Sequence, residues 1–65
     1  MISVQPTMNV AAQCRKFDAR MQTAPSVDAA AYLAYCKGLL LASVAMGAPQ
    51  PASNFIPMYE EEYES

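Results

Sequence analysis

Two stretches of the chain show the spacing of apolar positions that is typical of a helix. In the first stretch, four apolar residues recur at intervals of four, three and four: Val10, Cys14, Phe17 and Met21. Polar side chains occupy most of the positions between them, so the pattern predicts an amphipathic helix over residues 8–22. Pro25 ends this helix, because the residue before a proline avoids the α conformation.

The second stretch is almost wholly apolar. Ser26 suits the N-cap position, since its hydroxyl can accept a hydrogen bond from an amide of the first helical turn. The sequence then runs through alanine-rich, helix-favouring residues until Gly47 supplies a C-terminal stop, and the prolines at 49 and 51 prevent the helix from resuming. We therefore expect a second helix over residues 27–46.

With a turn near Pro25, the two predicted helices form an antiparallel hairpin. Residues whose numbers sum to about 50 then lie at the same height, which pairs the first apolar stripe with Leu40, Cys36, Leu33 and Ala29. Residues 47–54 resemble an extended spacer, and an apolar segment and a run of glutamates follow. The sequence predicts an all-α fold, an antiparallel two-helix hairpin over residues 1–54 with an extended Pro-rich, acidic C-terminal tail over residues 55–65.

At 65 residues the chain can form one small domain, in which apolar burial barely balances conformational entropy. A cross-link, a metal, a second copy or a partner must then add stability. The chain has no His, and its two Cys cannot fill the four positions of a structural zinc site, so we expect neither a metal nor a cofactor. The four scattered Lys and Arg form no stripe along a nucleic-acid backbone, and we expect no nucleic-acid partner.

Cys14 and Cys36 fall in the same layer of the predicted hairpin, and two interpretations stay open. A disulfide would close a loop of about 22 residues and stabilise the fold by about 3 kcal/mol. Alternatively, both residues are small buried hydrophobic side chains in a reducing compartment. Neither thiol has a base to activate it, and the sequence contains no glycine-rich phosphate loop, so we predict that the chain is not an enzyme.

The second helix is too apolar for an ordinary surface helix. Its clearly polar side chains are Asp28, Lys37 and Ser43, so the first helix can cover only one of its apolar faces. Aromatic residues are enriched among the hot spots of protein interfaces. We therefore predict that a partner protein contacts Tyr32, Tyr35, Leu39, Met46, Phe55 and Tyr59. The alternative is that Phe55, Ile56 and Tyr59 fold back over this helix.

A membrane is the less favoured partner. Residues 29–48 reach the length of about 20 that a bilayer span needs, but Lys37 falls near their middle, where a charge is costly. Residues 1–10 have neither a basic segment nor a continuous apolar run, so we predict no signal peptide. The expected location is cytoplasmic, the host cytoplasm for a phage-encoded chain, or periplasmic if a leader has been removed.

The segment Cys36-Lys-Gly38-Leu-Leu, preceded by Cys14 on an earlier helix, resembles the core of the Tai-type immunity proteins of bacterial type VI secretion. Asn54-Phe-Ile-Pro57 is similar to a later Phe-Cys-Ile-Pro stretch of that family, without its cysteine. The chain departs from the family pattern at Ala42, where a glycine would fall, and lacks the family's later helices. The resemblance covers roughly residues 10–57 and implies a small helical protein that inhibits an effector by occupying it, with Cys14, Cys36 and Gly38 as structural positions.

These observations predict a small non-enzymatic protein that binds another protein and forms either a homo-oligomer, as a dimer, or a larger complex. An inhibitor, either immunity-like or a phage protein directed against host or defence functions, is the favoured class. The alternative is a structural subunit of a larger assembly, such as a virion component or a single-span membrane subunit. The identity of the partner stays open.

Overall fold

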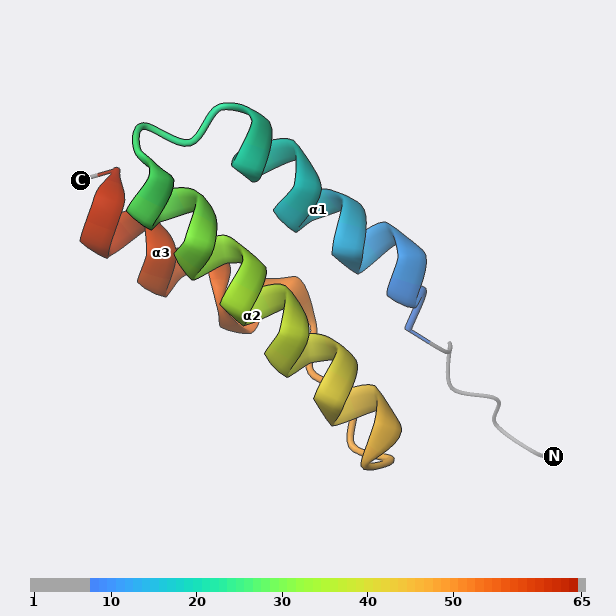
Figure 1. Ribbon diagram of the computed structural model, residues 1–65. Helices are drawn as coiled ribbons and strands as arrows, with labels where there is room; N and C mark the ends of the chain where they lie inside the picture. The colour runs from blue at the N-terminus through green and yellow to red at the C-terminus, as the bar shows by residue number, and fades with distance from the viewer. Residues whose placement is uncertain (1–7, 65) are drawn as a thin grey trace, which may run out of the picture.

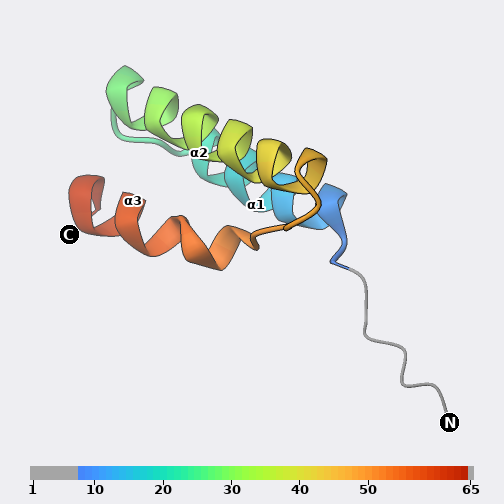
Figure 2. The same cartoon turned by 90° about the horizontal axis from the view of Figure 1, so that it is seen from below.

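The computed structural model describes residues 8–64, and all regular secondary structure in this part of the chain is helical, which confirms the predicted all-α class. The regular elements are α1 (Val10–Gln22), α2 (Val27–Ala45), a short 3-10 helix η1 (Ala52–Asn54) and α3 (Ile56–Tyr63). Figure 1 shows α1 and α2 side by side and running in opposite directions, with α3 returning toward the turn between them. Figure 2 shows α3 lying across one side of the pair. The N-terminal segment for which we predicted no leader falls mostly outside the described residues, as does Ser65.

Both long helices begin at a side chain that caps them. The Asn9 side chain accepts a hydrogen bond from the Ala12 amide at 3.0 Å, which explains why α1 begins at residue 10 rather than residue 8. Ser26 accepts one from the Ala29 amide at 3.1 Å, as its sequence position predicts. At the other end of α2, Gly47 has a φ of 78°, a left-handed conformation that glycine adopts without strain.

The hydrophobic core lies where the three helices meet. Its fully buried residues are Phe17, Ala29, Leu33, Cys36, Leu40, Ala52 and Tyr59. The other members of the predicted first stripe, Val10, Cys14 and Met21, are half-buried and pack against this core. Helical periodicity therefore identified the buried positions of α1 and α2. Ala52 and Tyr59 come from the segment that we expected to be extended.

The prediction of an extended tail over residues 55–65 is wrong, because most of this segment forms α3. Pro57 lies in the first turn of α3, where a proline has no intrahelical N–H bond to lose, so it does not break the helix. Tyr59 and Tyr63 are four residues apart and share a face of the helix. Their rings lie 6.3 and 5.4 Å from the ring of Tyr32 on α2, measured between centroids. Burial of these tyrosines thus stabilises a helix in a segment whose prolines predict none.

Polar contacts fix the C-terminal segment to α1 at two places. The Gln13 side chain accepts a hydrogen bond from the buried Ala52 amide at 2.8 Å. Further along α1, the Arg20 guanidinium lies 2.9 Å from a Glu60 carboxylate oxygen and 3.1 Å from one of Glu64. These two glutamates therefore form ion pairs with Arg20 that join the C-terminal segment to α1.

Candidate functional site

The outward half of α2 is apolar beyond its first turn. The exposed residues of α2 and its C-cap are Val27, Asp28, Ala31, Ala34, Tyr35, Gly38, Leu39, Leu41, Ala42, Ala45 and Met46. Asp28 is the one charged residue among them, and it sits in the first turn, where the helix dipole favours a carboxylate. By contrast, the exposed residues of α1 include Arg15, Lys16 and Gln22. One helix thus presents a solvated polar surface and its neighbour does not.

The polar side chains in the middle of α2 are occupied within the fold. Lys37 donates to the Asp18 carboxylate on α1 at 2.7 Å, and this hydrogen bond raises the pKa of Lys37. The Ser43 hydroxyl donates to the Leu40 carbonyl at 2.6 Å and accepts from the Gln50 amide at 2.9 Å. Neither side chain therefore adds a polar group to the outward half of the helix.

The structure divides the six predicted partner-binding residues into two sets. Tyr32, Phe55 and Tyr59 turn into the fold. Tyr59 is fully buried, Tyr32 is half-buried beside it, and Phe55 packs its ring 6.2 Å from that of Phe17. For these three residues the structure agrees with the fold-back alternative, so their surfaces are largely covered before any partner arrives.

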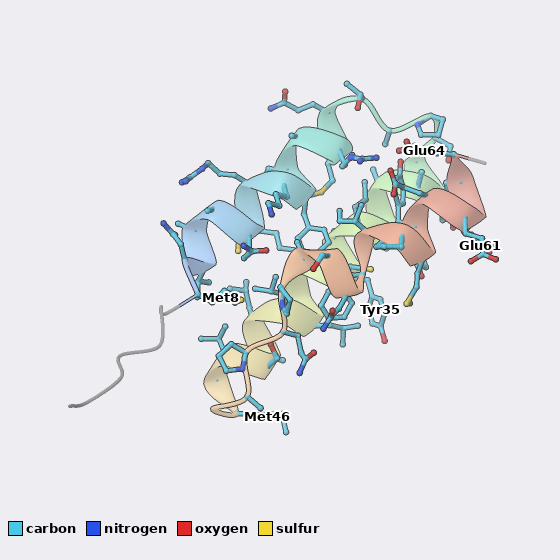
Figure 3. All side chains as sticks on the ribbon, turned by 180° about the vertical axis from the view of Figure 1, so that it is seen from behind. Met8, Tyr35, Met46, Glu61 and Glu64 are labelled. Carbon is cyan, nitrogen blue, oxygen red and sulfur yellow. The ribbon has the colours of Figure 1, made fainter. Side chains whose placement is uncertain are left out.

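The other three, Tyr35, Leu39 and Met46, are exposed, and we call them the outer patch. These residues are 65%, 38% and 83% accessible, respectively. Figure 3 shows the labelled Tyr35 and Met46 projecting outward from α2. Met58 on α3 adds a further exposed apolar side chain that the sequence reasoning missed. Met58 is exposed because of the way α3 is rotated about its own axis. The sequence reasoning treated this segment as extended, so it gave no helix face for Met58.

Both cysteines are free thiols in the structure, so the disulfide interpretation is not supported there. Cys36 is buried in the core, and burial raises the pKa of its thiol. Cys14 is half-buried against the same core. A raised pKa lowers the fraction of reactive thiolate, and this agrees with a packing role for Cys36.

The tyrosines form an aromatic cluster inside the fold. Tyr59 stacks on Tyr63 with centroids 5.6 Å apart, and Tyr32 meets Tyr63 edge-on. Burial is the main cause that raises the pKa of both Tyr32 and Tyr59. The buried Tyr59 hydroxyl makes no hydrogen bond of good geometry, although Glu64 lies near enough to raise the pKa of Tyr59 further. This cluster has the character of a core rather than of a reactive site.

Residues 8–64 enclose no detectable cavity and contain no cluster of three or more His, Cys, Asp or Glu side chains that could hold a metal. The uncovered half of α2 is therefore the candidate functional site. By length and composition alone, α2 could also cross a membrane, a property that it shares with core helices of small proteins. No protein-family model matches the chain, and comparisons with curated proteins and with solved structures also found no match.

Proposed function

We propose that this chain is a non-enzymatic protein that binds a partner protein through the uncovered half of α2. In this proposal α1 and α2 form a helical hairpin, and α3 covers one side of it. The observation that supports the proposal is the exposure of the outer patch on a helix face with no charge beyond its first turn. Monomeric proteins seldom expose a long apolar face unless something binds there.

Simple magnitudes indicate what such a face can supply. A helix of 19 residues is about 28 Å long and about 10 Å across, so its outward half presents about 450 Å². At about 25 cal/mol per Å² this surface gives a gross gain of about 11 kcal/mol. Association itself costs about 4 to 15 kcal/mol. The face therefore binds well only to a partner that packs closely around its large side chains, and Tyr35 and Met46 are the residues most suited to anchor that contact.

We further propose that binding inhibits the partner by occupying it. The resemblance to the Tai-type immunity proteins supports this role, because those proteins act on an effector in that way. Cys36 is buried and Cys14 packs against the core, so each stands where a structural position would be. Gly38 is exposed on α2, which suggests that it acts at an interface rather than in the core.

A structural subunit is the second candidate, and the length and apolar character of α2 favour it. A helix of this kind could insert into an assembly or span a bilayer. Against the bilayer, Lys37 and Asp18 form an ion pair halfway along the helix pair, which hydrocarbon would not solvate. We therefore rank a soluble assembly above a membrane span within this class.

Photo-crosslinking in the source cell tests the proposal. A benzophenone amino acid replaces Tyr35 in one variant and Gln22, exposed on α1, in the control. We expect one defined protein to be captured through position 35 and not through position 22. That protein, once purified, should form a one-to-one complex, weakened at least about ten-fold by combining Leu39→Gln with Met46→Gln.

Four results would count against this proposal. Equal capture from both positions would indicate a non-specific surface. Recovery of the chain in a multi-subunit particle would favour the structural class, and recovery in membranes that resist salt and alkaline washing but release the chain in detergent would favour a bilayer span. An unchanged affinity of the Leu39→Gln, Met46→Gln variant would remove the outer patch from the interface.

A further inference from the structure

We infer that the outward face of α2 pairs with α2 of a second copy, antiparallel and about a two-fold axis at Gly38. This inference rests on the same uncovered helix as the proposed function and shares Tyr35 with the outer patch, but its other residues are different. The outer patch lies along one flank of the helix. The second copy would use the centre of the face, where small side chains gather.

The centre of the face reads the same in both directions from Gly38. Ala31 and Ala45 lie seven residues before and after it, and Ala34 and Ala42 lie four residues before and after it. All five residues are exposed. Intervals of three, four and seven keep residues on one seam of a helix that pairs with another helix. A two-fold contact joins a surface to itself, so it requires this kind of symmetry, whereas a different partner does not.

Large and small side chains are placed so that two copies fit each other. Tyr35 and Leu41 lie three residues before and after Gly38, on opposite flanks of the seam. In an antiparallel pair centred there, residues whose numbers sum to about 76 lie at the same height. Leu41 of one copy then lies over Ala34 of the second, and Tyr35 lies over Ala42. Each large side chain meets an alanine, and glycine meets glycine at the axis.

The fold of one copy does not explain why position 38 is a glycine. A Cβ atom built there would meet nothing within 4 Å, and Gly38 does not have a positive φ. Glycine is the least helix-favouring residue after proline, so an exposed one in the middle of α2 weakens the helix. Close approach of a second backbone is a reason for its presence that α1 and α3 do not supply.

Charge and area agree with pairing of two copies. An antiparallel arrangement sets the helix ends of opposite partial charge beside each other, and it separates the two Asp28 carboxylates by about 30 Å along the axis. A parallel pair would bring these carboxylates together. The second copy covers only the centre of each outward face of about 450 Å², so the pair buries less than about 900 Å², which places the dimer among weak, concentration-dependent associations.

Sedimentation of the whole 65-residue chain from about 1 µM to about 1 mM tests the inference, with reductant present so that Cys14 and Cys36 stay thiols. We expect a monomer–dimer equilibrium. Gly38→Leu should raise the dimer dissociation constant at least about ten-fold, and circular dichroism should show equal or greater helix content, because leucine favours the helix and a Cβ atom at this exposed position meets nothing within 4 Å in one copy. Ala19→Leu, on the exposed side of α1, is the matched control and should leave the equilibrium unchanged.

A charge exchange tests the antiparallel register. Ala31→Glu and Ala45→Lys should each disrupt the dimer when made alone, since each introduces an unpaired charge into the seam. The two together should restore it, because position 31 of one copy lies beside position 45 of the other. A parallel pair would place like charges together and could not be rescued.

Several outcomes would overturn the inference. These are a monomer at every concentration, a dimer unaffected by Gly38→Leu, or single variants that the double variant does not rescue. Transfer of the chain to phosphatidylcholine vesicles, with no dimer in their absence, would assign the face to lipid. The proposed function is separable, because Leu39→Gln with Met46→Gln should weaken partner binding while the dimer persists.

Discussion

Lys37 lies with its ammonium 2.7 Å from the Asp18 carboxylate, so the only cation of α2 is bound to α1. A lysine at this position of an isolated helix would solubilise its surface. In this fold the lysine stem and its charge are turned toward the neighbouring helix, and both partners remain only partly exposed. The outward half of α2 is apolar because of this pairing as well as because of its alanines.

Truncation of two leucines of α2 should change stability by very different amounts. Leu33 is fully buried, whereas Leu41 is 45% exposed. We expect Leu33→Ala to lower the free energy of unfolding by about 2 to 5 kcal/mol, out of a total of about 3 to 10 kcal/mol for a chain of this size. Leu41→Ala should change it by less than about 1 kcal/mol. Urea denaturation at low micromolar concentration measures both. Equal losses would contradict the assigned core.

The hydrogen bond from the Ala52 amide to the Gln13 side chain should contribute more to stability than its partly buried position suggests. Gln13→Leu leaves the amide of a fully buried residue without its acceptor, and we expect a loss of about 1 to 3 kcal/mol in unfolding free energy. Gln13→Glu keeps an oxygen acceptor and should retain most of the stability. Hydrogen exchange at Ala52 is the direct measurement, and slow exchange in the Leu variant would show that the bond is dispensable.

Stability should fall as the pH rises above about 9. Burial raises the pKa of Cys36 above its ordinary value of 9.0 and those of Tyr32 and Tyr59 above 10.0, and the hydrogen bond to Asp18 raises that of Lys37 above 10.5. In each case the folded chain holds a proton that the unfolded chain releases first. The contribution is therefore complete below the unfolded pKa and is lost above it.

Melting temperatures measured from pH 7 to pH 11 check this dependence. We expect a plateau up to about pH 8.5 and then a decline. Cys36→Ala removes the first group to titrate, so its decline should begin nearer pH 10, whatever the variant's stability at pH 7. A flat profile to pH 11 would contradict the burial of these groups.

The Tyr59 side chain offers a test that separates its ring from its hydroxyl. The hydroxyl is buried without a hydrogen bond of good geometry, so Tyr59→Phe should leave the melting temperature unchanged or raise it. Tyr59→Ala removes the ring from the core and should lower the melting temperature by more than about 10 °C. A marked loss in the Phe variant would reveal a partner for the hydroxyl, with Glu64 as the first candidate.

Local sequence signals predicted the parts of the fold that depend on local rules. The N-cap at Ser26, the C-terminal stop at Gly47 and the stripe through Phe17 follow from neighbouring residues, and the structure has them there. The third helix did not follow. A proline breaks a helix in its interior, but Pro57 lies in the first turn of α3. That turn forms because the Tyr59 side chain is buried against α2.

The location of the candidate site was predicted from the sequence, but not all of its exposed residues were. An excess of apolar residues on α2 could be counted from the sequence, so the general location was available. Which residues stay exposed depends on what α3 covers, and this is a tertiary effect. Tyr32 and Tyr35 are three residues apart and similar in chemistry, yet α3 packs against the first and leaves the second uncovered.

The contribution of α3 to the core also has a consequence for the newly made chain. Ala52 and Tyr59 are fully buried in the fold, and both are made after α2. Until α3 packs against α2, the side of α2 that α3 later covers and its outward face are both open to water or to other chains. Protection from aggregation in that interval falls to folding factors, or to pairing between chains that emerge close together.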